Sequence, residues 1–293
     1  MKRMSRKIIT TLAVLLAVFT VSVAGWVAEA SMKTGQTGKE EASDVAVPVI
    51  MYHHILKDRN RWGDYIISPA EFEADLQYIT EAGYTSITVE QLIAYVTVGV
   101  PLPEKPIILS FDDGHRSFYA YAAPLLEQYG QRAVVAVVGE YSEQYSETDD
   151  HNVYYAYMSW EEIAEVSRSG VAEIQNHSYA LHDNTGKRSG AKKMRGESTE
   201  EYAAVLWQDI EPLQEKLEAV TGKRPNTFVY PFGAVSAESA GILREMGFAA
   251  AFDCESKLNR FRVGDTDALM EIHRVNRRHG YSAEAILAKL MSD

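Results

Sequence analysis

The stretch PIILSFDDG, residues 106–114, decides how this chain is organised. Its first four residues are apolar and mostly β-forming, which predicts a buried strand that ends at Asp112 and Asp113. Later in the chain, a second short strand predicted at 172–175 leads into NHSYALH, residues 176–182, which carries His177 and His182. Two histidines and one aspartate can hold a divalent metal and leave a coordination position open. The other aspartate is then free to act as a base.

Strand and helix signals alternate along the rest of the chain. Ser68 and Glu71 form a capping box with Pro69 at the first helical position, and Gly83 ends that helix. Ser236 is expected to cap a helix that ends at Met246. Strands are expected at 47–52, 84–87, 106–112, 133–138, 172–175, 227–230, 249–253 and 271–275. Seven to eight mostly parallel strands separated by helices predict an α/β fold, a distorted (β/α) barrel.

The first 46 residues are expected to lie outside the barrel. Residues 2–7 are basic, residues 8–27 are apolar, and Ala28-Glu29-Ala30 is typical of a cleavage site. Residues 1–30 are therefore interpreted as a signal peptide or an N-terminal membrane anchor, with cleavage favoured. Residues 31–46 are small and polar and predict a flexible linker. Residues 47–293 form the predicted catalytic domain, exported to the extracellular space or the cell surface.

The charge balance restricts the partners. The formal net charge is −12, and residues 1–30 carry four of the basic side chains and one acidic one. An acidic surface argues against nucleic acid and anionic lipid and suits a neutral or cationic glycan. No protein partner is predicted. With Cys254 as the single cysteine, no disulfide can form within the chain. The basic loop 183–198 is interpreted as a solvated insertion, with a loop that grips substrate as the alternative.

The two motifs predict more together than either does alone. Neighbouring side chains of an extended strand point in opposite directions, so Asp112 and Asp113 can take different roles at the strand end. His177 and His182 are five positions apart, which requires a loop between them rather than a helix. Parallel strands end at one edge of a sheet, where barrel enzymes carry their active residues.

On these residues the chain resembles the polysaccharide deacetylase family, also called the NodB-homology family or carbohydrate esterase family 4. Residues 110–114 match its first motif, and residues 177–182 match a longer form of its second. The early segment VPVIMYHH, residues 47–54, makes the chain look most like the branch that includes the poly-β-1,6-N-acetylglucosamine deacetylases. The resemblance covers about residues 47–280.

The resemblance implies a role for each matched residue. Asp112 would be the base that deprotonates a metal-bound water, and Asp113, His177 and His182 would hold the metal. Zinc is favoured, and cobalt, nickel and manganese are open. The segment Tyr230-Pro231-Phe232 would bind substrate and stabilise the oxyanion. His53 would be the general acid, with His54 and His273 as alternatives, since His53 shares a strand face with Val49 and Met51.

The sequence departs from the family at one position. Val229 stands where the third motif usually begins with an arginine that tunes the catalytic aspartate, and Arg274 is the expected substitute. Four aromatic residues are candidates for stacking on sugar rings, with packing in the core as the favoured alternative for each: Tyr52, Trp62, Trp160 and Tyr179.

The expected activity is metal-dependent hydrolysis of N-acetyl groups from N-acetylglucosamine units of an extracellular or cell-wall polysaccharide. Two alternatives remain. The same site can act on O-acetyl esters such as those of xylan, or the barrel can bind glycans without catalysis.

Overall fold

A computed structural model describes residues 44–292 of the chain. The predicted leader, residues 1–30, and nearly all of the predicted linker lie outside these residues. From Asp44 onward, no helix is both long enough and apolar enough to cross a membrane.

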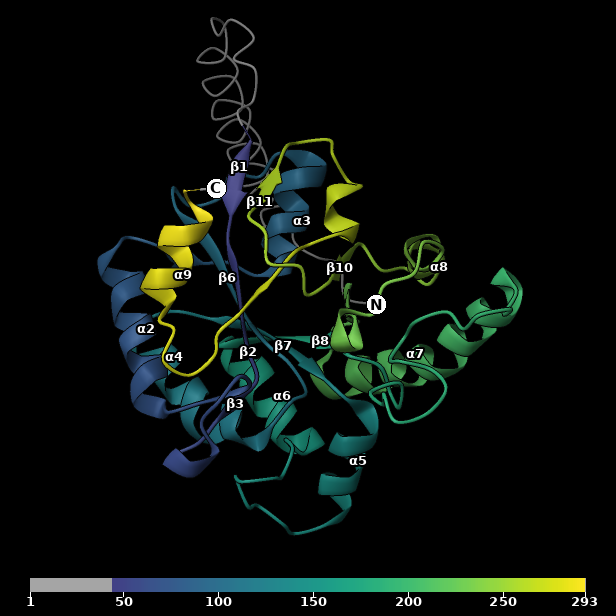
Figure 1. Ribbon diagram of the computed structural model, residues 1–293, viewed down its shortest axis with the longest axis horizontal. Helices are drawn as coiled ribbons and strands as arrows, with labels where there is room; N and C mark the ends of the chain where they lie inside the picture. Colours follow the sequence, from purple (N-terminus) through teal and green to yellow (C-terminus); the bar gives the residue numbers. More distant parts are fainter. Residues whose placement is uncertain (1–43, 293) are drawn as a thin grey trace, which may run out of the picture. The chain divides into compact units, whose positions relative to one another are not determined.

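A curled, mostly parallel sheet forms the centre of the fold, and helices cover it (Figure 1). Its strand order is β10-β9-β8-β7-β6-β2-β12, with β5 paired to the start of β6. The strands are β2 (Val49–Tyr52), β5 (Thr85–Ser86), β6 (Pro106–Phe111), β7 (Ala133–Val137), β8 (Ala172–Asn176), β9 (Thr227–Val229), β10 (Ala250–Phe252) and β12 (Val275–Asn276). This is the barrel-like sheet that the sequence predicts.

One segment joins the two edges of the sheet. Ile272 pairs with Phe252 of β10, and its backbone N–H donates to the carbonyl of Ala251. Three residues further on, Val275 and Asn276 pair with β2 at the other edge. The sheet therefore curls until residues 272–276 contact both edges, which brings side chains of that segment close to β6.

Helices follow most strands, and side chains cap their ends. Ser68, Thr88, Ser159 and Ser198 each form a capping box at a helix N-terminus, which satisfies backbone N–H groups that have no partner within the helix. The helices are α2 (Pro69–Glu81), α3 (Val89–Val98), α4 (Ala123–Gln128), α5 (Gly139–Glu147), α6 (Trp160–Ser169), α7 (Thr199–Thr221), α8 (Ser239–Glu245) and α9 (Ala283–Leu290).

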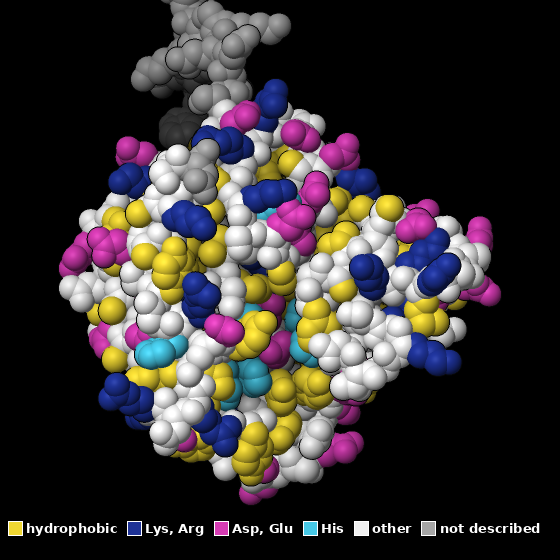
Figure 2. Space-filling view, in the orientation of Figure 1, with side chains coloured by type: hydrophobic (Ala, Val, Ile, Leu, Met, Phe, Trp, Pro, Cys, Tyr) yellow, Lys and Arg dark blue, Asp and Glu magenta, His cyan; other side chains and the backbone are white. Residues whose placement is uncertain are grey.

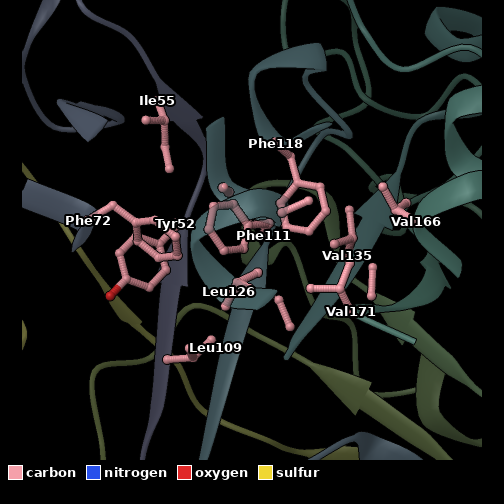
Figure 3. Packing of buried hydrophobic residues seen from close by; sticks show 14 of the residues in the cluster. Tyr52, Ile55, Phe72, Leu109, Phe111, Phe118, Leu126, Val135, Val166 and Val171 are labelled. Carbon is pink, nitrogen blue, oxygen red and sulfur yellow. The ribbon is translucent and has the colours of Figure 1, made fainter. Parts of the chain in front are cut away.

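The two faces of the sheet bury different residues. Tyr52, Leu109, Phe111 and Val135 pack outward, where Phe111 lies against Tyr52 and the α2 residue Phe72 (Figure 3). The alternate residues Val49, Ile108, Val134 and Ala136 belong to a separate cluster with α3. Because side chains alternate along a strand, Ser110 and Asp112 share the face of Ile108. The catalytic candidate is thus placed inside the curl by strand register.

Several details differ from the sequence predictions. Val45 and Ala46, expected in the linker, belong to β1 (Val45–Val47), which pairs antiparallel with β11 (Asn259–Phe261). Ser236 does not cap α8, because its hydroxyl instead accepts a hydrogen bond from the Lys193 N–H and the helix begins only at Ser239, with Glu238 at the N-cap position. The strand expected at 271–275 is reduced to the Ile272 bridge and β12. Helix α5 was not predicted, since its sequence is polar and begins with glycine.

Candidate active site

The site lies where β2, β6, β8 and β9 end. Asp113, Ser178 and Phe232 each follow one of these strand ends, and in residues 44–292 they are the only non-glycine residues with positive φ, at 68°, 75° and 58°. Such backbone conformations cost free energy and are held by the surrounding structure. Gly114 follows Asp113 with φ 75°, and a Cβ there would lie 2.9 Å from Val137 Cγ1. The turn after β6 therefore requires glycine at position 114.

Three side chains converge at this edge of the sheet. Asp113 Oδ1 lies 3.0 Å from His182 Nε2 and 3.5 Å from His177 Nε2. One potential ligand atom from each of the three lies within 4.8 Å of the others. Asp112 contributes its Oδ2 at 3.9 Å from His177 Nε2. The structure thus brings together all four residues that the two motifs singled out.

The protonation of His177 explains what this cluster can bind. Its Nδ1 lies 2.7 Å from the carbonyl oxygen of Val229, so Nδ1 carries the hydrogen and donates it. A ring that donates through Nδ1 and carries no second hydrogen presents a lone pair on Nε2 to the carboxylate of Asp113. Asp113 Oδ1 is itself buried and accepts no hydrogen bond from the residues that the structure describes. Two lone pairs that face each other fit a cation between them, as a divalent metal would provide.

The loop between His177 and His182 is fixed by hydrogen bonds to helix α7. Asn176, the last residue of β8, accepts a hydrogen bond from the Ser178 N–H at 2.8 Å. Its side-chain amide donates to the carbonyl of Ile210 and to Gln214, both in α7. The carboxylate of Asp209 accepts hydrogen bonds from the N–H groups of Tyr179 and Ala180. Helix α7 therefore fixes the loop that presents His182.

Arg274 contacts Asp112, as expected for the residue that replaces the family's usual arginine at the position of Val229. The guanidinium is fully buried, and its Nη1 donates to Asp112 Oδ1 at 2.5 Å and to Ser110 Oγ at 2.9 Å. Its Nε donates to the carbonyl of Asp253. Burial opposes ionisation of Asp112, but the charges of Arg274, His177 and His53 and the hydrogen bond from Arg274 together outweigh it, so the pKa of Asp112 is lowered. Asp112 is therefore a carboxylate that can accept a proton.

The three histidines considered as general acid differ in their contacts. His54 is bonded through Nδ1 to Ser117 Oγ at 2.6 Å, and burial lowers its pKa to about 3. His273 Nδ1 lies 2.9 Å from Asp253 Oδ2, and His273 does not line the cavity over the site. His53 lines that cavity, and its Nδ1 is buried without a partner among residues 44–292. Burial also lowers the pKa of His53.

A cavity of about 630 Å³ opens over the cluster. Figure 2 shows histidine and acidic side chains gathered in a hollow near the centre of the visible face. Phe232 lines the cavity, is 45% exposed, and its ring centroid lies 4.6 Å from that of His182. Tyr230 and Pro231 are buried, and the Tyr230 hydroxyl donates to Ser239 Oγ. Of the three predicted substrate-binding residues, only Phe232 faces the cavity.

The four aromatic candidates for stacking on sugars do not line this cavity, as the favoured packing interpretation expected. Tyr52 is in the core, and the indole N–H of Trp160 donates to Glu143. The indole N–H of Trp62 donates to the carbonyl of Leu56. Tyr179 packs against Gly139, where a Cβ would lie 2.4 Å from Tyr179 Cδ2. Within the described residues, the exposed aromatic side chains that line the cavity are instead Tyr65 and Phe232.

His115 is a site residue that the sequence reasoning missed. Its Nε2 lies 3.4 Å from Asp113 Oδ2, and its ring stacks between His54 and Tyr157, with centroids at 4.2 and 4.7 Å. Its position directly after the Asp-Asp-Gly turn was the available signal. The basic loop contributes Asn184 to the cavity lining, while Arg188 pairs with Glu197 inside the loop.

A curled parallel sheet with carboxylates and imidazoles converging at its carboxyl edge defines the class of (β/α)-barrel enzymes. A family model described as polysaccharide deacetylase matches residues 99–251, just over half of the chain. The chain belongs to the polysaccharide deacetylase family.

Named relatives agree with this assignment. The chain is 27% identical over 199 residues to a poly-β-1,6-N-acetyl-D-glucosamine N-deacetylase of Escherichia coli, a match that covers 62% of this chain and 30% of that protein. A protein of the same name from Staphylococcus aureus is 23% identical, with 66% of this chain and 63% of that protein covered. The chain thus spans less than two thirds of the length of these relatives. The structure of IcaB from Ammonifex degensii is similar with a TM-score of 0.66 and 25% identity, over 84% of this chain and 96% of that one.

Proposed function

We propose that this protein is a metal-dependent hydrolase that removes acetyl groups from N-acetylglucosamine units of a polysaccharide. The observation that carries the proposal is the convergence of Asp113, His177 and His182, with Asp112 beside them. The buried Oδ1 of Asp113 has an imidazole nitrogen of each histidine within 3.5 Å but forms no well-aligned hydrogen bond with the described residues. The names of the relatives favour a poly-β-1,6-linked substrate.

Asp113, His177 and His182 would hold the metal. One carboxylate and two imidazoles are a ligand set that suits zinc and leaves at least one position open for substrate or water. When bound, a divalent metal would lower the pKa of a water molecule and polarise the acetamide carbonyl. The same donor set also accepts cobalt, nickel and manganese, so zinc is proposed as the first metal to test.

Asp112 would take the proton from the attacking water. Its pKa is lowered, so it is ionised over the whole neutral range and available as a base. Arg274 holds the carboxylate through Nη1, which also donates to Ser110 Oγ, and neither Arg274 nor Ser110 lines the cavity. The second oxygen of Asp112 is the one that lies near His177 and can reach the reacting water.

His53 would give a proton to the departing amine. It lines the cavity together with Asp112 and Asp113, and its Nδ1 has no partner in residues 44–292. A histidine whose pKa is lowered releases its proton readily once it carries one. On the other side of the cavity, Phe232 sits in a positive-φ turn directly after Tyr230-Pro231, and its backbone N–H is the proposed donor to the oxyanion.

The proposed location is outside the cytoplasm. The basic, apolar and small-residue pattern of residues 1–30 supports export, by a cleaved signal or by an uncleaved anchor. A polysaccharide of the cell wall or the extracellular matrix would be within reach of an exported enzyme.

The test is acetate release from oligomers of N-acetylglucosamine, linked β-1,6 or β-1,4, with metal content measured on the same preparation. Metal-stripped protein should be inactive, and zinc, cobalt or manganese should restore activity. Acetylated xylan is the comparison substrate, because preferential release from its esters would favour the O-acetyl esterase. Tight binding of the oligomers without release under any metal would favour the non-catalytic barrel.

A further inference from the structure

A second cavity of about 390 Å³ adjoins the cavity over the catalytic residues. Tyr65 and Asn276 line both cavities and therefore form a shared wall. Tyr65 is 60% exposed, and its ring packs edge-on to His53 with 4.8 Å between the centroids. Tyr65 therefore stands between the cavity over Asp113 and the second cavity.

Asn276, which lines both cavities, has a side-chain oxygen that accepts no hydrogen bond from the described residues. The side-chain amide of Asn276 donates through Nδ2 to the carbonyl oxygen of Asp64 at 2.7 Å, which fixes the orientation of the amide. The other atom, Asn276 Oδ1, is buried and has no partner among the described residues. A buried acceptor of this kind is normally satisfied. A sugar hydroxyl or an acetamide N–H would satisfy it.

The second cavity is lined by more basic than acidic side chains, although the whole chain is acidic. Arg278 and Lys289 line it, and neither has a carboxylate oxygen within 4.0 Å in the described part of the chain. The guanidinium of Arg278 lies over the ring of Tyr281, 5.4 Å from its centroid. Asp64 is the one carboxylate residue among the lining residues, so the cavity has a net positive charge in a chain of net charge −12.

We propose that this second cavity is a subsite for a neighbouring sugar unit and that it selects a unit that is still acetylated. The proposal rests on the proposed function. Both an N-acetylglucosamine unit and a glucosamine unit offer hydroxyl and N–H donors to Asn276 Oδ1, but only the N-acetylglucosamine unit is neutral. A glucosamine unit carries an ammonium group, which Arg278 and Lys289 repel. Removal of one acetyl group therefore disfavours reaction at the adjacent unit on one side, and the product carries spaced glucosamines.

The experiment compares three β-1,6-linked pentasaccharides: one fully acetylated, and two with a single glucosamine next to the central unit, on one side or on the other. Acetate release from the central unit gives kcat/KM, and calorimetric titration of Asp112→Asn protein gives binding without turnover. One of the two glucosamine isomers should react and bind about fivefold more weakly than the fully acetylated oligomer, as expected for charges separated by a few ångströms near water.

The double variant Arg278→Gln, Lys289→Gln should remove that difference, while Lys223→Gln should keep it, because Lys223 lines a different cavity and pairs with Glu90. Equal rates and affinities for all three oligomers in the wild type would overturn the subsite, as would a double variant that still discriminates. If no oligomer releases acetate but the binding preference holds, the subsite stands and the proposed hydrolysis is wrong.

Discussion

Each end of the parallel sheet carries a cavity, and the two cavities have similar volumes, about 630 Å³ at the carboxyl end and about 690 Å³ at the amino end. At the amino end, both oxygens of Glu173 accept N–H bonds from Val89 and Glu90 at the start of α3, and Lys223 pairs with Glu90. At the carboxyl end, Asp113 Oδ1 and His53 Nδ1 are buried and form no well-aligned hydrogen bond among residues 44–292, although His182 Nε2 lies 3.0 Å from Asp113 Oδ1.

The contrast shows that volume does not identify the reactive end. Polar groups that satisfy one another stabilise a structure, whereas buried polar groups that converge without satisfying one another leave room for a ligand. The backbone agrees, since the non-glycine residues with positive φ in the described chain, Asp113, Ser178 and Phe232, all belong to the carboxyl end. Matched substitutions at the two ends can break or sharpen this comparison.

The largest effect is expected for Asp112→Asn. The amide keeps the size of the side chain and can still accept from Arg274, but it cannot take a proton from water. kcat for acetate release should fall about 10²–10⁴-fold, the usual contribution of a general base, with the metal still bound. Glu173→Gln is the matched control at the amino end and should leave kcat unchanged. Comparable losses in both variants would contradict the assignment of the reaction to the carboxyl end.

His177→Ala should weaken zinc binding by more than about 100-fold, because it removes a direct ligand and not merely a group that supports one. Equilibrium dialysis or a competing chelator measures the change without reference to activity. His273→Ala is the control. With Asp253 and Glu271, His273 forms the second group of potential metal ligands in the described chain, but its Nδ1 is hydrogen-bonded to Asp253. Loss of zinc from the His273 variant alone would move the metal to that cluster.

Arg274→Lys tests how Asp112 is held. A lysine keeps the positive charge but cannot contact Ser110, Asp112 and the Asp253 carbonyl together, as the guanidinium does. Loss of one charged hydrogen bond corresponds to roughly tenfold in kcat. Zinc affinity should stay unchanged, since Arg274 contacts none of the three proposed ligands. A variant that loses zinc and activity together would show that Arg274 supports the metal site as a whole.

Much of the fold could be predicted because its signals are local. The serines and the threonine that cap α2, α3, α6 and α7 directly precede their helices in the sequence. Asp112 and Asp113 likewise directly follow the apolar residues of strand β6. The contact of Arg274 with Asp112 could be suggested only from the valine at position 229. It forms because residues 272–276 join both edges of the curled sheet, and closure of this kind leaves no local signal in the sequence.

The errors at the site have a common physical cause. Tyr52 was a candidate for stacking on sugar, with core packing as the favoured interpretation, and it does pack in the core, because it shares a strand face with Ile50, which packs outward into the helices. The alternation that correctly placed His53 inside the curl therefore also excluded Tyr52. His115 was missed because its contact with Asp113 depends on the positive φ of Asp113 and Gly114, which no residue pattern specifies. Strand faces can be predicted from the sequence, whereas the directions of strained turns cannot.

The smallest effect on activity and the clearest effect on stability are expected at Glu173. Burial raises the pKa of Glu173 from 4.5 to about 7, against the opposing bonds from the N–H groups of Val89 and Glu90. Between these two pH values the unfolded chain has released the proton and the folded chain still holds it, so the free energy of unfolding falls as pH rises, by at most about 1.4 kcal/mol per pH unit. Glu173→Gln should flatten this slope in urea unfolding measured at pH 5, 6 and 7, and should leave acetate release unchanged. Parallel slopes in the two proteins would show that Glu173 is ionised throughout, held by the N–H groups of Val89 and Glu90.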